Sequence, residues 1–208
     1  MDVEPEPPVA GQIFGKQIVL ARRFAANLAR YGEERGLIGP LEPQRLWSRH
    51  ILNCGVFADM LAPGTLVGDV GSGAGLPGLV LALARPDVSF VLIEPMERRT
   101  DWLLEQVDEL GLGNVDVCRS RVQDAPFQER CDVVTARAVS ALKTLIPMTA
   151  PLAKPGGRLL LMKGANVDRE IHEAQRQIRA HKLHDLGVIL AGAELLEEPT
   201  RLVQATVD

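Results

Sequence analysis

The stretch GDVGSGAGLPG, residues 68–78, lies between a short apolar run and a helical pattern, and it decides the fold. Its three alternating glycines are Gly71, Gly73 and Gly75. Glycine lets a backbone turn tightly and approach a ligand closely, and the amides of the following helix N-terminus can face that ligand. The stretch therefore predicts a strand-to-helix turn that binds a nucleotide-like cofactor.

The identity of that cofactor does not follow from the glycines. Read from Gly71, the dinucleotide-binding pattern GxGxxG fails, because Leu76 occupies its sixth position. Read from Gly73, the same pattern is complete and ends at Gly78. The spacing alone leaves both a dinucleotide and other nucleotide-like cofactors open.

Two carboxylates favour a cationic cofactor. Asp69 stands beside the loop, where a negative charge repels a pyrophosphate but attracts a cation. Glu94 ends the next predicted strand, about 20 residues after the loop, where an acid can accept hydrogen bonds from ribose hydroxyls. S-adenosylmethionine carries an ammonium and a sulfonium group and no phosphate, so it is the predicted cofactor.

Outward from the loop, short apolar runs alternate with helical stretches. The runs are TLVGDVG at 65–71, SFVLIEP at 89–95, NVDVCRS at 114–120, CDVVTARA at 131–138 and RLLLMKG at 158–164, with weaker ones over 185–190 and 201–207. The helical stretches begin at Leu76 and cover 98–110, 142–152 and 168–182. This alternation predicts an α/β fold with a doubly wound, mostly parallel sheet of the Rossmann-like kind.

The first 62 residues follow a different pattern. Residues 1–10 hold three prolines and three acids among few large apolar groups, which predicts a disordered tail. Apolar residues at steps of three and four predict an amphipathic helix over 12–34, and a second helix is predicted over 42–61. The stripe of the first helix consists of Phe14, Ile18, Ala21, Ala25 and Leu28. We expect one domain over 11–208, in which a helical cap over 11–62 covers an α/β core over 63–208.

Composition limits the partners and the compartment. With 208 residues and 46% hydrophobic content, the chain can bury one substantial core. A net charge of −4 is not typical of a nucleic-acid-binding protein, so any RNA contact must be local. No apolar run approaches the roughly 20 residues of a membrane span, and MDVEPEPPVA does not resemble a signal peptide. We therefore expect a cytoplasmic protein without a membrane partner, and a monomer.

Cysteine and histidine patterns do not predict a metal site. The three cysteines form no CxxC pair. His172 and Glu173 begin an HExxH pattern that fails because Arg176 occupies its last position. No metal cofactor is expected.

The absence of certain motifs restricts the range of possible methyl acceptors. Methylation of base amino groups often uses an Asn/Asp-Pro-Pro-aromatic motif after the fourth strand, where this chain reads TARA at 135–138. Methylation of cytosine C5 needs a nucleophilic thiolate. None of Cys54, Cys118 and Cys131 has the Pro-Cys or Thr-Cys surroundings usual for that role. The remaining class is a substrate whose acceptor lone pair is already available.

Several short segments follow one another in the order seen in a known family. They are HIL at 50–52, GDVGSGAGLPG at 68–78, RR at 98–99, SRVQD at 120–124, ARA at 136–138 and MKG at 162–164. Over roughly residues 46–171 the chain resembles the bacterial 16S rRNA guanine-N7 methyltransferases, the glucose-inhibited division protein B family. The resemblance implies S-adenosylmethionine as cofactor and 16S rRNA or the small ribosomal subunit as partner.

The resemblance also implies roles for individual residues. Glu94 would hold the cofactor's ribose, Val122 and Gln123 would meet its adenine, and Arg137 would lie beside both the cofactor and the incoming base. Together with the loop, the expected cofactor-binding set is Asp69, Gly71, Gly73, Gly75, Leu76, Glu94, Val122, Gln123 and Arg137. The residues expected to face RNA are Arg98, Arg99 and Lys163.

Guanine N7 has a free lone pair, and no proton must leave when it is methylated. The predicted catalytic role of Arg137 is therefore to position the base, because a guanidinium does not act as a base near neutral pH. Two other classes stay open on the sequence. A nicotinamide-dependent oxidoreductase shares the pattern from Gly73 to Gly78, and a non-catalytic RNA-binding or ribosome assembly protein could keep the same fold.

Overall fold

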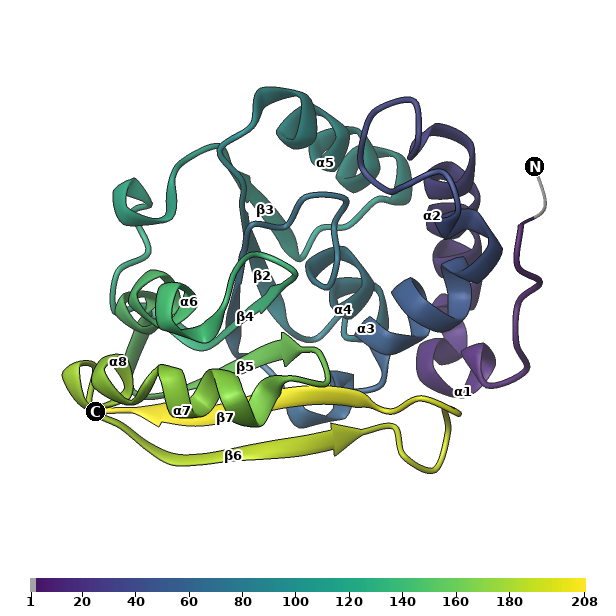
Figure 1. Cartoon of the computed structure of the whole chain (residues 1–208). Helices are drawn as coiled ribbons and strands as arrows, with labels where there is room; N and C mark the ends of the chain where they lie inside the picture. Colours follow the sequence, from purple (N-terminus) through teal and green to yellow (C-terminus); the bar gives the residue numbers. More distant parts are fainter. Residues whose placement is uncertain (1–2) are drawn as a thin grey trace.

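A computed structural model describes residues 3–208 and contains a seven-stranded sheet with helices on both faces (Figure 1). The strand order is β3-β2-β1-β4-β5-β7-β6. The strands are β1 Leu66–Val70, β2 Ser89–Ile93, β3 Val115–Cys118, β4 Cys131–Arg137, β5 Ala153–Lys163, β6 Leu183–Ala191 and β7 Thr200–Val207. Neighbours from β3 to β5 are parallel, whereas β7 runs antiparallel to β5 and β6. The predicted doubly wound, mostly parallel sheet is confirmed.

The order of the strands creates a crevice at the middle of the sheet. β1 pairs with β2 on one side and with β4 on the other, so the chain winds outward in both directions from β1. The register places Val70 beside Ile93 and beside Ala136, which brings the carboxyl ends of three strands together. In open α/β sheets, ligands bind where the strand order reverses.

Helices cover each face of the sheet, and the sheet separates two hydrophobic cores. The N-terminal helices pack on one face with α4 (Gly78–Ala84) and α5 (Glu97–Leu110), and α6 (Leu142–Thr149), α7 (Val167–Glu173) and α8 (Gln175–Ala180) cover the other (Figure 1). The short 3₁₀ turns η5 (Val122–Asp124) and η6 (Ala150–Leu152) precede β4 and β5. No helix in the described part of the chain is long and apolar enough to cross a membrane.

The helix predicted over 168–182 is two helices, α7 and α8. They meet at Ala174, which is fully buried and lies outside the helical region at φ −94° and ψ 6°. Val167 in α7 and Ile178 in α8 are buried in the core on that face, and they pack the two helices against the sheet. The sequence shows a continuous polar pattern there, so it does not reveal the break.

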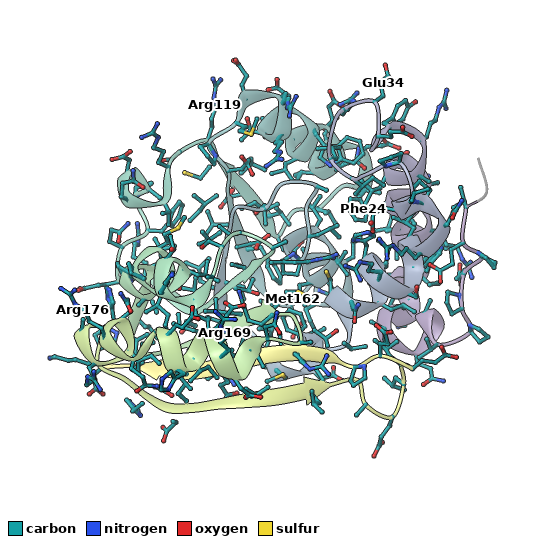
Figure 2. The ribbon with its side chains drawn as sticks, in the orientation of Figure 1. Phe24, Glu34, Arg119, Met162, Arg169 and Arg176 are labelled. Atoms are coloured by element: carbon teal, nitrogen blue, oxygen red, sulfur yellow. The ribbon has the colours of Figure 1, made fainter. Side chains whose placement is uncertain are left out.

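The first helix of the cap is broken near its start. α1 (Ala10–Phe14) is followed by the 3₁₀ turn η1 (Gly15–Gln17) and by α2 (Ile18–Tyr31). Gly15 adopts a positive φ of 48°, which turns the chain between them. Most of the predicted stripe is buried, together with Phe24, which α2 points toward the sheet (Figure 2).

The prediction of one continuous second cap helix over 42–61 is wrong. The structure has η2 (Glu42–Arg45), the π-helical η3 (Leu46–Leu52), α3 (Asn53–Gly55) and η4 (Ala58–Met60). A regular amphipathic helix buries one stripe. Here the adjacent residues Leu46 and Trp47 are buried, as are Ile51 and Leu52, and the irregular backbone gives all of them apolar contacts.

Residues 3–10 make specific contacts with the cap, whereas the sequence predicts a disordered tail over 1–10. The Glu4 N–H donates to the Pro43 carbonyl at 2.9 Å, and Glu6 forms an ion pair with Arg22 at 2.5 Å. Polar contacts and the burial of Ala10 offset the ordering entropy, which the composition alone did not indicate. Residues 1 and 2 lie outside the described residues.

Candidate active site

A pocket of about 420 Å³ opens at the carboxyl ends of β1, β2 and β4. Its lining includes five residues that the sequence predicts to hold a cofactor, namely Gly71, Glu94, Val122, Gln123 and Arg137. Its remaining walls combine apolar and polar side chains. The crevice predicted from the strand order is therefore an actual cavity, and its lining comes from five separate segments of the chain.

Gly71 contributes its backbone to the lining of this pocket. Its N–H donates to the Ile93 carbonyl at 2.8 Å, which ties the end of β1 to the end of β2. Gly71 has φ 69°, and a Cβ there would lie 2.9 Å from Cγ2 of Val139. A side chain at this position would be strained and crowded, so glycine keeps the backbone exposed to the pocket.

Glu94 links the glycine loop to the following helix. Its Oε2 accepts a hydrogen bond from the Gly73 N–H at 3.0 Å, and its Oε1 accepts one from the Met96 N–H at 3.0 Å. The residue is only 2% exposed, and Nη1 of Arg99 lies 3.8 Å from Oε2. A carboxylate has about four lone-pair sites, so Glu94 keeps acceptor capacity for a ligand in the pocket.

Asp69 has a different position from the one expected. It is fully buried and lies outside the pocket lining, and its Oδ2 accepts a hydrogen bond from the Gly78 N–H at 3.0 Å. Burial raises the pKa of Asp69 to about 7, and the charge of Glu94 acts in the same direction. Through this hydrogen bond Asp69 anchors the first residue of α4 to β1. It does not face the pocket because β1 is enclosed on both faces of the sheet.

Gly73, Gly75 and Leu76 belong to the loop but also lie outside the lining of this pocket. Gly73 contributes its N–H to Glu94. Gly75 and Leu76 are buried, and Leu76 belongs to the core shared with the cap. The loop thus presents Gly71 to the pocket, and its other predicted residues shape the turn.

Arg137 ends β4 and is joined to the cap. Its Nη2 donates to Nδ1 of His50 at 2.5 Å, and its Nη1 lies 3.3 Å from Sγ of Cys54 and 3.5 Å from the His50 carbonyl. Nε2 of His50 in turn lies 2.5 Å from Oε2 of Glu42. A chain of hydrogen bonds therefore runs from η2 through η3 to the end of the sheet.

Burial is the largest cause that lowers the pKa of His50, to about 4, and the neighbouring Arg137 charge lowers it further. The hydrogen bond and charge of Glu42 act in the opposite direction but are outweighed. His50 is therefore neutral near pH 7. Since a guanidinium only donates, Nδ1 accepts from Arg137 and the proton is assigned to Nε2, which donates to Glu42.

A second pocket, of about 490 Å³, meets the first at Arg137 and Ala138. Four basic residues contribute to it, namely Arg49, Arg137, Lys163 and Arg201, together with the single acid Glu198. Ala138, at the boundary, has φ 53°, a conformation that residues with a Cβ rarely adopt. Strained backbone of this kind concentrates at functional sites. Met162, labelled in Figure 2 at the end of β5, also lines this pocket.

The residues expected to face RNA have three different environments. Arg98 is exposed, and its guanidinium lies against the cap loop at Gly36. Arg99 lines the first pocket instead of the outer surface. Lys163 lines the second pocket, but its Nζ is paired with Glu170 at 2.7 Å and bonded to the Ser140 carbonyl at 2.9 Å.

Sequence reasoning missed the residues that the cap brings to the site. Glu42 and Cys54 carried no site prediction, His50 was part of the family-like HIL segment only, and Arg201 received no role. No local pattern identifies them, because His50 and Arg137 are 87 positions apart. Among the described residues, no group of three or more His, Cys, Asp or Glu could hold a metal ion.

The sheet order, the glycine loop at the end of β1 and the acid at the end of β2 together define a Rossmann-like methyltransferase fold of class I. Solved structures share it. A SAM-dependent methyltransferase from Aquifex aeolicus matches with a TM-score of 0.60 and 20% identity, covering 85% of this chain and 98% of that chain. M. jannaschii TYW2, solved in complex with AdoMet, matches with a TM-score of 0.61 and 18% identity, covering 77% of this chain and 76% of that chain.

The sequence identifies the family within this class. Residues 17–197 match GidB, described as rRNA small subunit methyltransferase G. The "Ribosomal RNA small subunit methyltransferase G" of Leifsonia xyli subsp. xyli (strain CTCB07) is 60% identical over 205 residues, which cover 99% of this chain and 98% of the relative. The chain belongs to this methyltransferase family. The resemblance seen in the sequence is confirmed, and the oxidoreductase and non-catalytic alternatives lose their support.

Proposed function

We propose that this protein transfers a methyl group from S-adenosylmethionine to N7 of a guanine in 16S rRNA of the small ribosomal subunit. The observation that carries the proposal, beside the family, is that two pockets meet at Arg137 and Ala138. A transfer reaction needs a donor and an acceptor held side by side, and two adjoining pockets supply that arrangement. We assign the pocket at the glycine loop to the cofactor and the basic pocket to the nucleotide.

The residues of the first pocket fit S-adenosylmethionine. Its volume of about 420 Å³ lies within the roughly 300–1,000 Å³ typical of ligand sites. Glu94 offers acceptor capacity to ribose hydroxyls, and Val122 offers an apolar surface to the adenine beside Gln123. Nε of Arg99 is buried and has no hydrogen-bond partner among the described residues, so it is available to an acceptor on the cofactor. We therefore propose a cofactor contact for Arg99.

When bound, the cofactor supplies an electrophilic methyl group on a sulfonium. The protein's own contribution is positional. Arg137 can donate two parallel hydrogen bonds to an acceptor edge such as guanine O6 or to a phosphate. Orientation of this kind can contribute roughly 7–11 kcal/mol to lowering a barrier. Attack by the N7 lone pair would break the bond between sulfur and the methyl carbon and leave its electron pair on sulfur, and no residue of the protein would need to accept a proton.

The basic pocket fits a polyanion in spite of the chain's net charge of −4. Arg49 and Arg201 are exposed at its rim, and Asn53 and Thr200 are half-buried or buried beside them. Thr200 Oγ1 bonds the Asn53 carbonyl at 2.8 Å, which joins β7 to the cap across the pocket. We propose that the target guanine is unstacked into this pocket, because a base inside a duplex cannot reach Arg137. We further propose that the protein acts as a monomer in the bacterial cytoplasm.

The test is transfer of a labelled methyl group to small ribosomal subunits from cells that lack this protein, followed by mapping of the labelled base. The proposal expects one labelled guanine per subunit, as 7-methylguanosine. Label on another atom or base, or none with a folded protein that binds S-adenosylhomocysteine, overturns it. Subunits from cells that contain the protein serve as the control and should accept little label.

A further inference from the structure

We propose that Glu42 and His50 are positioning residues for Arg137, so that the N-terminal cap sets the direction of the guanidinium at the junction of the two pockets. The proposal rests on the proposed function for what Arg137 does. It adds that a hydrogen-bonded chain from the cap determines how Arg137 does it. In this role neither Glu42 nor His50 needs to touch the substrate.

The geometry gives Arg137 two contacts with one residue. Nη2 donates to the ring nitrogen Nδ1 of His50 at 2.5 Å, and Nη1 lies 3.5 Å from the carbonyl of the same residue. Sγ of Cys54, 3.3 Å from Nη1, closes the same side. The terminal nitrogens are therefore held from the side of the cap, and the planar guanidinium cannot rotate without breaking both contacts. Its remaining N–H donors have no hydrogen-bond partner among residues 3–208, so they can act as a directed fork.

Glu42 completes the chain by fixing the imidazole. Its Oε2 lies 2.5 Å from Nε2 of His50, and its Oε1 accepts from Arg45 at 2.5 Å. Nε of Arg49 lies 3.7 Å from Oε2. A carboxylate on one ring nitrogen selects the tautomer in which the other nitrogen accepts a hydrogen bond. Glu42 thus keeps His50 Nδ1 free of a proton and available to Arg137.

The charges around His50 support the same tautomer. The charged groups that face it are Glu42 from η2, Arg49 from η3 and Arg137 from β4. Burial and the two arginines outweigh Glu42 and lower the pKa of His50 to about 4. A protonated ring would place an N–H donor against the Arg137 donor, so the contact requires the neutral ring.

The first experiment measures single-turnover methyl transfer to small subunits with RNA and cofactor saturating. His50→Leu keeps an apolar volume but removes both ring contacts, and we expect the rate to fall about 10- to 100-fold, by analogy with partners that orient metal-bound histidines. S-adenosylhomocysteine affinity should stay within about twofold of the wild type. His50→Gln can accept from Arg137 and donate to Glu42, so it should recover much of the rate. His184→Leu, at an exposed histidine on β6, is the matched control and should transfer at the wild-type rate.

The second experiment separates positioning from a structural role. Arg137→Met abolishes the directed fork, and adding His50→Leu to it should cause no further loss, because both changes remove one function. Additive losses, or a His50→Leu rate that follows only the loss of thermal stability, overturn the proposal. A folded His50→Leu protein with the full rate overturns it as well.

A third readout does not depend on activity. ¹⁵N chemical shifts of labelled protein should show His50 unprotonated at Nδ1 and protonated at Nε2 from pH 6 to pH 8, and Glu42→Gln should weaken that preference. A protonated Nδ1 at pH 7 overturns the chain of contacts. If the wild type methylates another atom while these shifts hold, the proposed function fails and the positioning contact stands.

Discussion

At the scale of single residues, one side chain can serve both the fold and the ligand. Glu94 was predicted from its place at a strand end to hold the ribose of a cofactor. In the structure it lines the pocket, but its oxygens already accept from the amides of Gly73 and Met96. The carboxylate therefore shapes the glycine loop before any ligand binds, and changes at Glu94 should alter binding and loop order together.

Glu94→Gln should weaken S-adenosylhomocysteine binding by about 1.5–3 kcal/mol, because a charge-assisted acceptor is lost and one amide N–H then faces an NH₂ group. The loss should be measurable by titration calorimetry, together with a lower Tm. Glu34→Gln removes an exposed carboxylate on the cap (Figure 2) and is the matched control. Unchanged affinity in a folded Glu94→Gln protein would remove Glu94 from the cofactor site.

Arg137→Lys keeps the positive charge but should lower the single-turnover rate by about tenfold or more, because an ammonium cannot reproduce the planar two-donor fork. Cofactor affinity should fall less than the rate. Arg176→Lys, at an exposed position on α8, provides the control (Figure 2). Equal losses in affinity and rate would indicate that Arg137 acts mainly on the cofactor.

At the scale of elements, the contact between β1 and α4 explains two features of the glycine loop. Asp69 on β1 accepts from the N–H of Gly78, the first residue of α4. A Cβ on Gly78 would overlap the side chain of Leu92 and lie 2.5 Å from Oδ2 of Asp69. The glycine that completes the dinucleotide-like pattern is therefore needed for close helix–sheet packing, whichever cofactor binds.

Gly78→Ala should destabilise the protein by about 1–3 kcal/mol, the usual cost of overpacking a close contact. Urea unfolding would measure it. Gly113→Ala is the control, because a Cβ there meets no atom within 4 Å. A Gly78→Ala protein as stable as the wild type would mean that α4 can move away from the sheet at little cost.

The raised pKa of Asp69 predicts that the stability of the protein depends on pH with a definite sign. Its pKa is raised from 3.8 to about 7 in the folded state, so the folded protein holds this proton more tightly than the unfolded chain. That stabilisation is complete below pH 3.8 and is lost as the pH rises to about 7. Asp69→Asn removes the titration and can still accept from Gly78.

The free energy of unfolding of Asp69→Asn, minus that of the wild type, should therefore be larger at pH 8 than at pH 5, because only the wild type loses stability over that range. The difference should be on the order of 1 kcal/mol or more, since each pKa unit corresponds to about 1.4 kcal/mol. Urea unfolding of both proteins at the two pH values measures it, and other titrating groups cancel in the comparison. An offset that is the same at both values would contradict a raised pKa for Asp69.

At the scale of the whole molecule, the cap and one face of the sheet share a hydrophobic core. Phe24 and Leu46 from the cap belong to the same buried cluster as Phe90 and Leu92 of β2. A shared core makes independent unfolding of either part costly, because each would expose apolar surface of the other. We therefore propose that the cap over 11–62 and the α/β core over 63–208 form one cooperative unit.

The two tryptophans make this testable, since Trp47 lies in the cap and Trp102 lies on α5. Trp102→Phe leaves Trp47 as the only fluorophore of its kind, and Trp47→Phe leaves Trp102. In each variant, the fluorescence transition in urea should coincide with the loss of far-UV circular dichroism, as two-state unfolding requires. An earlier transition at Trp47 alone would show that the cap unfolds as a separate unit.

The sequence by itself determined the class of fold, the turn at Gly71 and the acid at Glu94. These depend on patterns within a few residues, such as alternating glycines and apolar runs of strand length, and local backbone preferences fix them. Only the tertiary structure decided that Asp69 faces a helix N-terminus, that the segment over 42–61 is irregular, and that His50 meets Arg137. Each of these depends on which distant segments pack together, and burial and strand register set that packing in ways that no local pattern records.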